Sequence, residues 1–144
     1  MIKIYLRCLL GTLWLCVVSP GFAEDTPVVV VNSITYPNAF LSQNAITAIF
    51  GMRLRKWEDG SPIKVFVMPD GNPIHIAFSK YVLRVFPYQL RSAWNRLVFS
   101  GTGEEPMIVE SEEKMREAIS STPGAIGYLS RSMLNESVKA ISND

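Results

Sequence analysis

The feature that most constrains this chain is an uninterrupted β-branched run at residues 28–31, four consecutive valines followed shortly by Ile34. A strand of this composition is apolar on both faces, which is typical of a strand covered by other elements on each side. Further apolar runs follow along the chain, and the segments between them carry apolar residues at helical spacing. Strands that alternate with helices predict an α/β fold in which the helices pack on a largely parallel sheet.

Capping and turn residues set the expected boundaries. Ser42 is expected to cap the first helix, with Gly51 in a left-handed conformation past its end. Asn72 followed by Pro73 is the usual start of a helix. The expected strands are residues 28–34, 63–68, 107–109, 125–129 and 138–141, and the expected helices are residues 42–50, 73–85, 87–99 and 111–119.

The N-terminus has the three parts of a cleavable signal peptide. Lys3 and Arg7 precede an apolar run at residues 8–18, and a short stretch rich in small residues then ends at Ala23. The apolar run is shorter than the ~20 residues with which a helix spans a bilayer. Cleavage is therefore expected after Ala23.

Two other kinds of N-terminal segment also begin with an apolar run. An uncleaved membrane anchor stays open as an alternative, whereas a lipid anchor is disfavoured because Cys16 follows Leu15 rather than a small residue. The sequence thus predicts a signal peptide at residues 1–23 and a single domain at residues 24–144, located in the periplasm.

Composition without the leader excludes several classes of protein. The remaining chain has no cysteine and one histidine, and its 12 basic residues face 13 acidic ones, which gives a net charge of −1. Near-neutral charge argues against a nucleic-acid partner. A zinc site, or a catalytic group based on cysteine or histidine, has almost nothing to be made from. We therefore expect no metal and no cofactor.

Several segments occur in an order and spacing shared with one protein family. They are Leu41-Ser42, Ile49-Phe50-Gly51, Trp57 with Asp59-Gly60, residues 63–68, Phe78, Trp94 with Phe99 and Gly101, and Pro-Gly-Ala-Ile-Gly-Tyr at residues 123–128. Together they resemble one lobe of the phosphate-type periplasmic substrate-binding proteins, which feed ABC uptake transporters. The resemblance implies a three-layer α/β/α lobe of a type II periplasmic binding protein, with a mostly parallel sheet of about five strands. The family's receptors close two such lobes around the ligand, and the resemblance covers one.

The resemblance also implies where phosphate would be bound. In the family, an arginine near the end of the strand that matches residues 63–68 contacts the anion, together with Ser-Gly-Thr at the next helix start. Here residues 67–74 read Val-Met-Pro-Asp-Gly-Asn-Pro-Ile, with no arginine or hydroxyl, and with Pro73 where an amide donor is needed. The chain therefore resembles the receptor's scaffold without its phosphate-binding side chains.

What remains at this position is a weak candidate ligand site at a helix start and cleft edge. Its residues are Asp70, Gly71, Asn72, Ile74 and His75. Asp70 is expected to repel phosphate unless another group neutralises it, while the amides of Ile74 and His75 are expected to be free donors. His75 lies off the apolar stripe of its helix, so its ring is expected to face solvent or the cleft edge.

A second candidate is the group of cations Arg53, Arg55 and Lys56, which could form a partner surface beside Trp57. The simpler alternative is the solvated face of a hairpin. Trp57 itself and Trp94 are expected to be buried anchors of the core.

The leading functional hypothesis is an exported, non-enzymatic binding or interaction domain. It rests on the resemblance and on the absence of an assembled catalytic set. One alternative is a genuine solute-binding component for phosphate or another small anion in ABC transport, and another is a small periplasmic enzyme. The expected partners are accordingly a weakly bound small anion such as phosphate, an ABC permease or other envelope protein, or a second copy of the chain.

Overall fold

The computed structural model describes residues 26–36 and 40–142 of the 144-residue chain. The predicted signal peptide at residues 1–23 and its cleavage after Ala23 lie outside the described residues. Within the described ranges, no helix is both long and apolar enough to cross a membrane.

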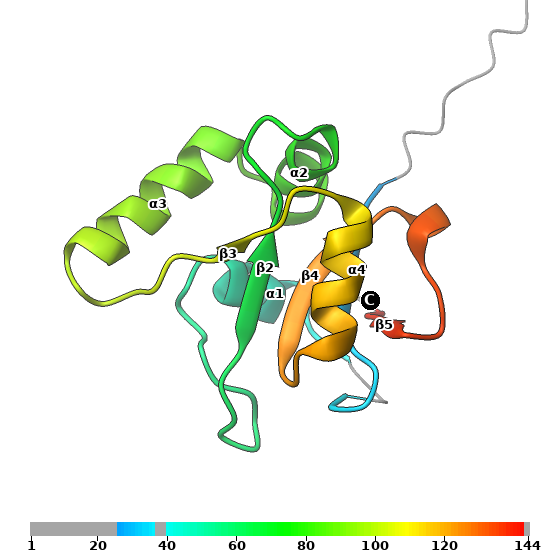
Figure 1. Cartoon of the computed structure of the whole chain (residues 1–144). Helices are drawn as coiled ribbons and strands as arrows, with labels where there is room; N and C mark the ends of the chain where they lie inside the picture. Colours follow the sequence, from blue (N-terminus) through cyan, green and yellow to red (C-terminus); the bar gives the residue numbers. More distant parts are fainter. Residues whose placement is uncertain (1–25, 37–39, 143–144) are drawn as a thin grey trace, which may run out of the picture.

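A five-stranded sheet forms the centre of the molecule, in the order β3-β2-β4-β1-β5 (Figure 1). The strands are β1 (Val28–Asn32), β2 (Lys64–Val67), β3 (Met107–Ile108), β4 (Ala125–Leu129) and β5 (Val138–Ala140). All five expected strands are therefore present, which confirms the α/β prediction, and their ends differ from the expected ones by at most two residues.

The sheet is mixed, and its parallel part is confined to one half. β2 runs parallel to both β3 and β4, whereas β1 runs antiparallel to both β4 and β5. The expectation of a mostly parallel sheet holds only around β2, where long connections join the neighbouring strands. The apolar run at residues 28–31 indicates that β1 is covered on both faces. It does not indicate the direction of β1 relative to its neighbours, because these neighbours come from the far end of the chain.

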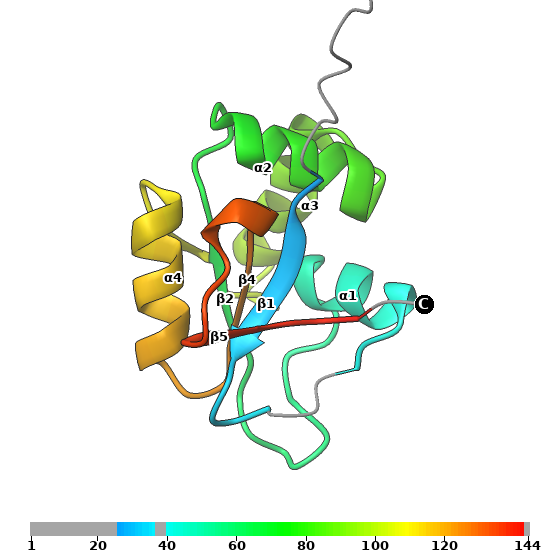
Figure 2. The ribbon, with the colours of Figure 1, turned by 90° about the vertical axis from the view of Figure 1, so that its right-hand side faces the viewer.

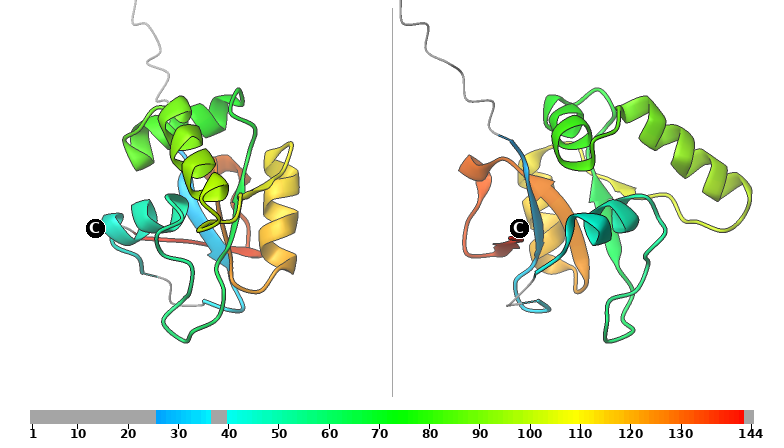
Figure 3. Two further views of the ribbon diagram at one scale, coloured as in Figure 1. Left: turned by 90° about the vertical axis from the view of Figure 1, so that its left-hand side faces the viewer. Right: turned by 180° about the vertical axis from the view of Figure 1, so that it is seen from behind.

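Helices cover both faces of the sheet. They are α1 (Gln43–Phe50), α2 (Pro73–Ala77), the π-helix η1 (Phe78–Leu83), α3 (Pro87–Phe99), α4 (Glu112–Ser121) and the 3₁₀-helix η2 (Arg131–Met133). Figure 2 shows α4 on one face and α1 on the other, which gives the expected three layers. α3 projects beyond the β2 side of the sheet (Figure 3).

The predicted caps are mostly confirmed. Ser42 accepts a hydrogen bond from the Ala45 amide at 3.2 Å and starts α1, and Asn72 starts α2 with Pro73 in its first turn. The end of α1 differs from the prediction, because Gly51 has φ −83° and Met52 has φ 60°. A side chain at position 51 would lie 2.9 Å from the Thr47 carbonyl oxygen. Glycine is therefore needed there for close approach and not for a left-handed backbone.

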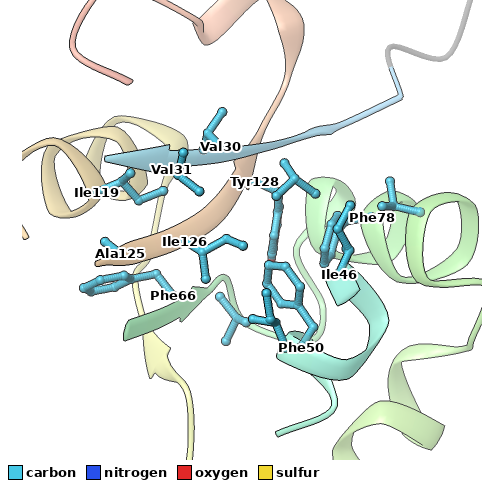
Figure 4. Close-up of a cluster of buried hydrophobic side chains, with 14 of the residues drawn as sticks. Val30, Val31, Ile46, Phe50, Phe66, Phe78, Ile119, Ala125, Ile126 and Tyr128 are labelled. Carbon is cyan, nitrogen blue, oxygen red and sulfur yellow. The ribbon is translucent and has the colours of Figure 1, made fainter. Parts of the chain in front are cut away.

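The core is apolar and aromatic, and it lies on both faces of β4 and β1 (Figure 4). Phe78 stacks on Tyr128 with ring centroids 4.0 Å apart, and Phe50 packs edge-on against Phe78. The expected burial of both tryptophans is confirmed: Trp57 is 8% exposed and Trp94 is 1% exposed. Each indole N–H donates to a buried carbonyl, as a buried tryptophan requires.

Candidate functional site

The candidate ligand site is the β2–α2 turn, residues 68–72, together with the first residues of α2. It follows the carboxyl end of β2, the edge at which open α/β sheets place ligands. The turn closes through a hydrogen bond of 2.9 Å from the Asn72 amide to the Pro69 carbonyl oxygen. The chain thus brings Asp70, Gly71 and Asn72 together where the sequence predicts them.

Asn72 uses the donors that were expected to be free. Its side-chain oxygen accepts hydrogen bonds from the Ile74 amide at 2.8 Å and from the His75 amide at 3.4 Å. The expectation of two unoccupied amides at this helix start is therefore wrong. The reason is that an N-cap residue satisfies the same orphan N–H groups that an anion would bind.

Asp70 is neutralised by an arginine that sequence reasoning missed. Arg91 of α3 donates from Nε to Asp70 Oδ2 at 3.0 Å and from Nη2 to Asp70 Oδ1 at 2.9 Å, a bidentate pair. Its Nη1 donates to Glu105 Oε1 at 2.8 Å, and its guanidinium lies 5.0 Å from the centre of the Trp94 ring. Hydrogen bonds from Arg91 lower the pKa of the Asp70 carboxyl below its ordinary value. This cation is therefore held by two carboxylates and a ring.

His75 is buried instead of facing solvent or a cleft, so that expectation is wrong. Its ring is fully inaccessible, and Nδ1 lies 2.5 Å from the Tyr128 hydroxyl oxygen. That oxygen accepts a hydrogen bond of 2.8 Å from the Met68 amide. The Tyr128 hydroxyl can therefore donate its own proton to His75 Nδ1. A neutral imidazole carries one proton, and with Nδ1 as the acceptor this proton is assigned to Nε2.

The Nε2 atom of His75 has no hydrogen-bond partner among the described residues. It lies 3.8 Å from Asp70 Oδ1, beyond hydrogen-bond distance. Burial lowers the pKa of the His75 imidazole. The nearby Asp70 carboxylate acts in the opposite direction but does not outweigh the burial. Burial also raises the pKa of the Tyr128 hydroxyl well above its ordinary value. The pair is therefore neutral at pH 7, and it holds the end of β2 against β4.

The second candidate, Arg53, Arg55 and Lys56, lies on an exposed segment after α1. A bridge between Lys56 and Pro62 makes this segment part of a hairpin, and Arg55 donates to the Thr102 carbonyl oxygen at 2.6 Å. Trp57 points into the core and cannot share a surface with these cations. In the described part of the chain, no three His, Cys, Asp or Glu side chains lie close enough together to hold a metal ion.

Comparison with known structures gives close agreement in fold. An ABC-type phosphate transport receptor from Vibrio cholerae superposes with a TM-score of 0.65 at 18% identity, covering 83% of this chain and 46% of the receptor. A phosphate-bound ABC transporter substrate-binding protein from Clostridium perfringens gives 0.66 at 19% identity, with 83% and 45% covered. PstS from Borrelia burgdorferi gives 0.64 at 12% identity, with 83% and 47% covered.

The chain spans slightly less than half the length of each of these structures. No curated protein sequence matches it significantly. At family level, residues 22–143 match the description "PBP superfamily domain". The chain therefore belongs to the PBP superfamily, and its fold is that of one lobe of the phosphate receptors.

Proposed function

We propose that this chain is an exported, non-enzymatic binding or interaction domain that uses one receptor-like lobe and does not capture phosphate at its β2–α2 turn. The observation that carries this proposal is the helix start of α2. Its two amides nearest to an incoming anion already donate to Asn72, so an anion would have to displace the cap.

The charges at the turn support the same conclusion. The Asp70 carboxylate lies at the turn and is 41% exposed, so a phosphate would meet a like charge. Arg91 is the cation that contacts the turn, but its guanidinium is already paired with the carboxylates of Asp70 and Glu105. An anion would have to break that ion pair to use it. Its gain would be small, since one open lobe leaves a bound anion half in water.

Titration calorimetry with inorganic phosphate at physiological salt tests the proposal. We expect a dissociation constant in the millimolar range or weaker, on the order of 4 kcal/mol of binding free energy or less. The Vibrio cholerae receptor, titrated under the same conditions, is the positive control for the method.

Two results would overturn the proposal. Micromolar binding by the monomer would make the chain a genuine solute-binding component. Micromolar binding that appears only at concentrations where the protein dimerises would show that a second copy supplies the other lobe. Sedimentation velocity at each concentration separates these two results.

A further inference from the structure

A groove of about 320 Å³ lies between α1 and α3, away from the β2–α2 turn. We call it the α1–α3 groove. Ten residues line it: Thr47, Gly51, Arg53, Leu83, Val85, Gln89, Leu90, Ala93, Arg96 and Leu97. A hydrogen bond of 2.7 Å from the Trp94 indole to the Phe50 carbonyl oxygen holds the two helices together beneath it. Figure 3 shows how α3 extends past the end of α1.

The floor of the groove is aliphatic. Leu83 and Leu90 are buried, whereas Val85, Ala93 and Leu97 are only half-buried and keep part of their apolar surface open to the groove. The α3 residues among them recur at helical spacing, so they form one continuous stripe. The volume and the apolar lining are those of a small-molecule site, which proteins usually build from hydrophobic walls and few polar groups.

Two neutral polar atoms of the lining, the Gln89 side-chain oxygen and the Thr47 hydroxyl oxygen, already take part in hydrogen bonds. The side-chain oxygen of Gln89 accepts the Phe86 amide at 2.9 Å, and the Thr47 hydroxyl donates to the Gln43 carbonyl oxygen at 3.0 Å. These groups stabilise their own helices and offer little to a ligand.

Two cations of the lining, Arg53 and Arg96, in contrast have guanidinium groups with no hydrogen-bond or ion-pair partner among the described residues. Both side chains are exposed. None of the ten lining residues is acidic. The groove therefore combines an apolar floor with two uncompensated positive charges, each able to bind a carboxylate in bidentate geometry.

We propose that the α1–α3 groove binds a small anionic amphiphile, with an aliphatic chain on the floor and a single carboxylate held by Arg53 and Arg96. A purely polar anion would leave the floor wet, and a purely apolar molecule would leave both arginines unused. This site is separate from the β2–α2 turn, so phosphate binding at the turn and amphiphile binding in the groove can each be true or false alone.

Octanoate is the probe for this proposal. In ¹H–¹⁵N spectra of the purified protein, octanoate should cause saturable shifts of amides around Ala93 and Leu97, with the β2–α2 turn unchanged. The double variant R53Q/R96Q should weaken octanoate binding roughly tenfold or more. R131Q/K139Q, which removes the same charge from exposed positions on η2 and β5, should leave it unchanged.

Two further probes separate the contributions of charge and chain. Octanol should bind more weakly than octanoate and be insensitive to R53Q/R96Q, and octylammonium should not bind. The proposal is overturned if octanoate shifts no groove residue or if R53Q/R96Q binds it as well as the parent. It is also overturned if these arginines prove to hold a second copy, so that R53Q/R96Q dissociates a dimer in sedimentation. None of these outcomes would alter the phosphate titration.

Discussion

Two arginines on the same helix, Arg91 and Arg96 of α3, illustrate the difference between two regions of this molecule. Arg91 faces the β2–α2 turn and is held by Asp70, Glu105 and the Trp94 ring. Arg96 borders the α1–α3 groove, and its guanidinium makes no ion pair or hydrogen bond with the described part of the chain. Among the described residues, the charged side chain at the turn is paired and the helix-start amides are capped, with His75 Nε2 left without a partner, whereas the groove leaves both of its guanidinium groups unpaired.

The difference teaches that the place where a fold usually binds its ligand need not offer free binding groups. The turn lies where the fold would place a ligand, yet Asn72 caps the start of α2, Asp70 pairs with Arg91 and the His75 ring contacts Tyr128. Superfamily membership alone therefore says little about which surface of this lobe binds a partner.

The largest expected effect on stability comes from a variant that tests whether Tyr128 is needed to hold the end of β2 and the His75 ring in place. Tyr128→Phe removes the hydroxyl that accepts the Met68 amide and contacts His75 Nδ1. Both groups are then buried without partners, and we expect a loss of about 1–3 kcal/mol in the free energy of unfolding. Denaturant unfolding measures this loss. Tyr88→Phe, at a ring that is 68% exposed, is the matched control and should change stability by less than about 0.5 kcal/mol.

If Tyr128→Phe cost no more than Tyr88→Phe, water would have to reach the end of β2. The turn would then be open, and its contrast with the groove would fail.

Much of the fold could be predicted because its signals are local. Caps such as Ser42 and Asn72, and the prolines that open α2 and α3, act within a few residues of themselves. The direction of β1 could not be predicted, since its partners β4 and β5 lie about a hundred residues away in sequence.

The candidate site was predicted less well for a related reason. Asp70 and Asn72 stand out in the sequence, but Arg91 is 21 residues from Asp70 and occurs in a helix with no distinguishing motif. The contact between His75 and Tyr128 spans 53 residues. The helical spacing of the apolar residues places His75 off their stripe, yet the Tyr128 hydroxyl on β4 gives its ring a polar partner in a buried position.

A smaller effect, confined to acid pH, follows from His75, the only histidine of the chain. Burial lowers its pKa, although Asp70 raises it, and the other groups that face it are Arg91 and Tyr128. The unfolded chain takes up a proton below pH ~6.5 while the folded chain does not. This contribution to stability is therefore complete above pH ~6.5 and is lost as the pH falls, by at most about 1.4 kcal/mol per unit.

Unfolding free energies measured between pH 8 and pH 5 check this slope. In His75→Gln the same range should be flatter, whatever the variant's absolute stability. A parent protein that becomes more stable toward pH 5 would mean that folded His75 takes up a proton more readily than the unfolded chain does, which contradicts a neutral buried ring. A slope that survives unchanged in His75→Gln would mean that other groups cause it.

The smallest expected effect on stability comes from Asp70→Asn, which sharpens the comparison by removing the carboxylate at the turn. The ion pair with Arg91 is partly exposed, so its loss should cost less than about 1 kcal/mol. Phosphate should then bind somewhat better, because a like charge is gone and one side of Arg91 is released. Binding should nevertheless stay in the millimolar range, since Glu105 still holds Arg91 and Asn72 still occupies the amides of α2.

Calorimetry with phosphate measures this change, and Asp59→Asn on the hairpin is the matched control for net charge. Equal affinities in the two variants would show that only the overall charge matters and that the turn contributes nothing. Micromolar binding in Asp70→Asn would show the opposite: a built anion site blocked by a single carboxylate, with the Asn72 cap yielding to the ligand. Only an intermediate result, a gain specific to Asp70 that stays weak, fits a turn whose donors are already engaged.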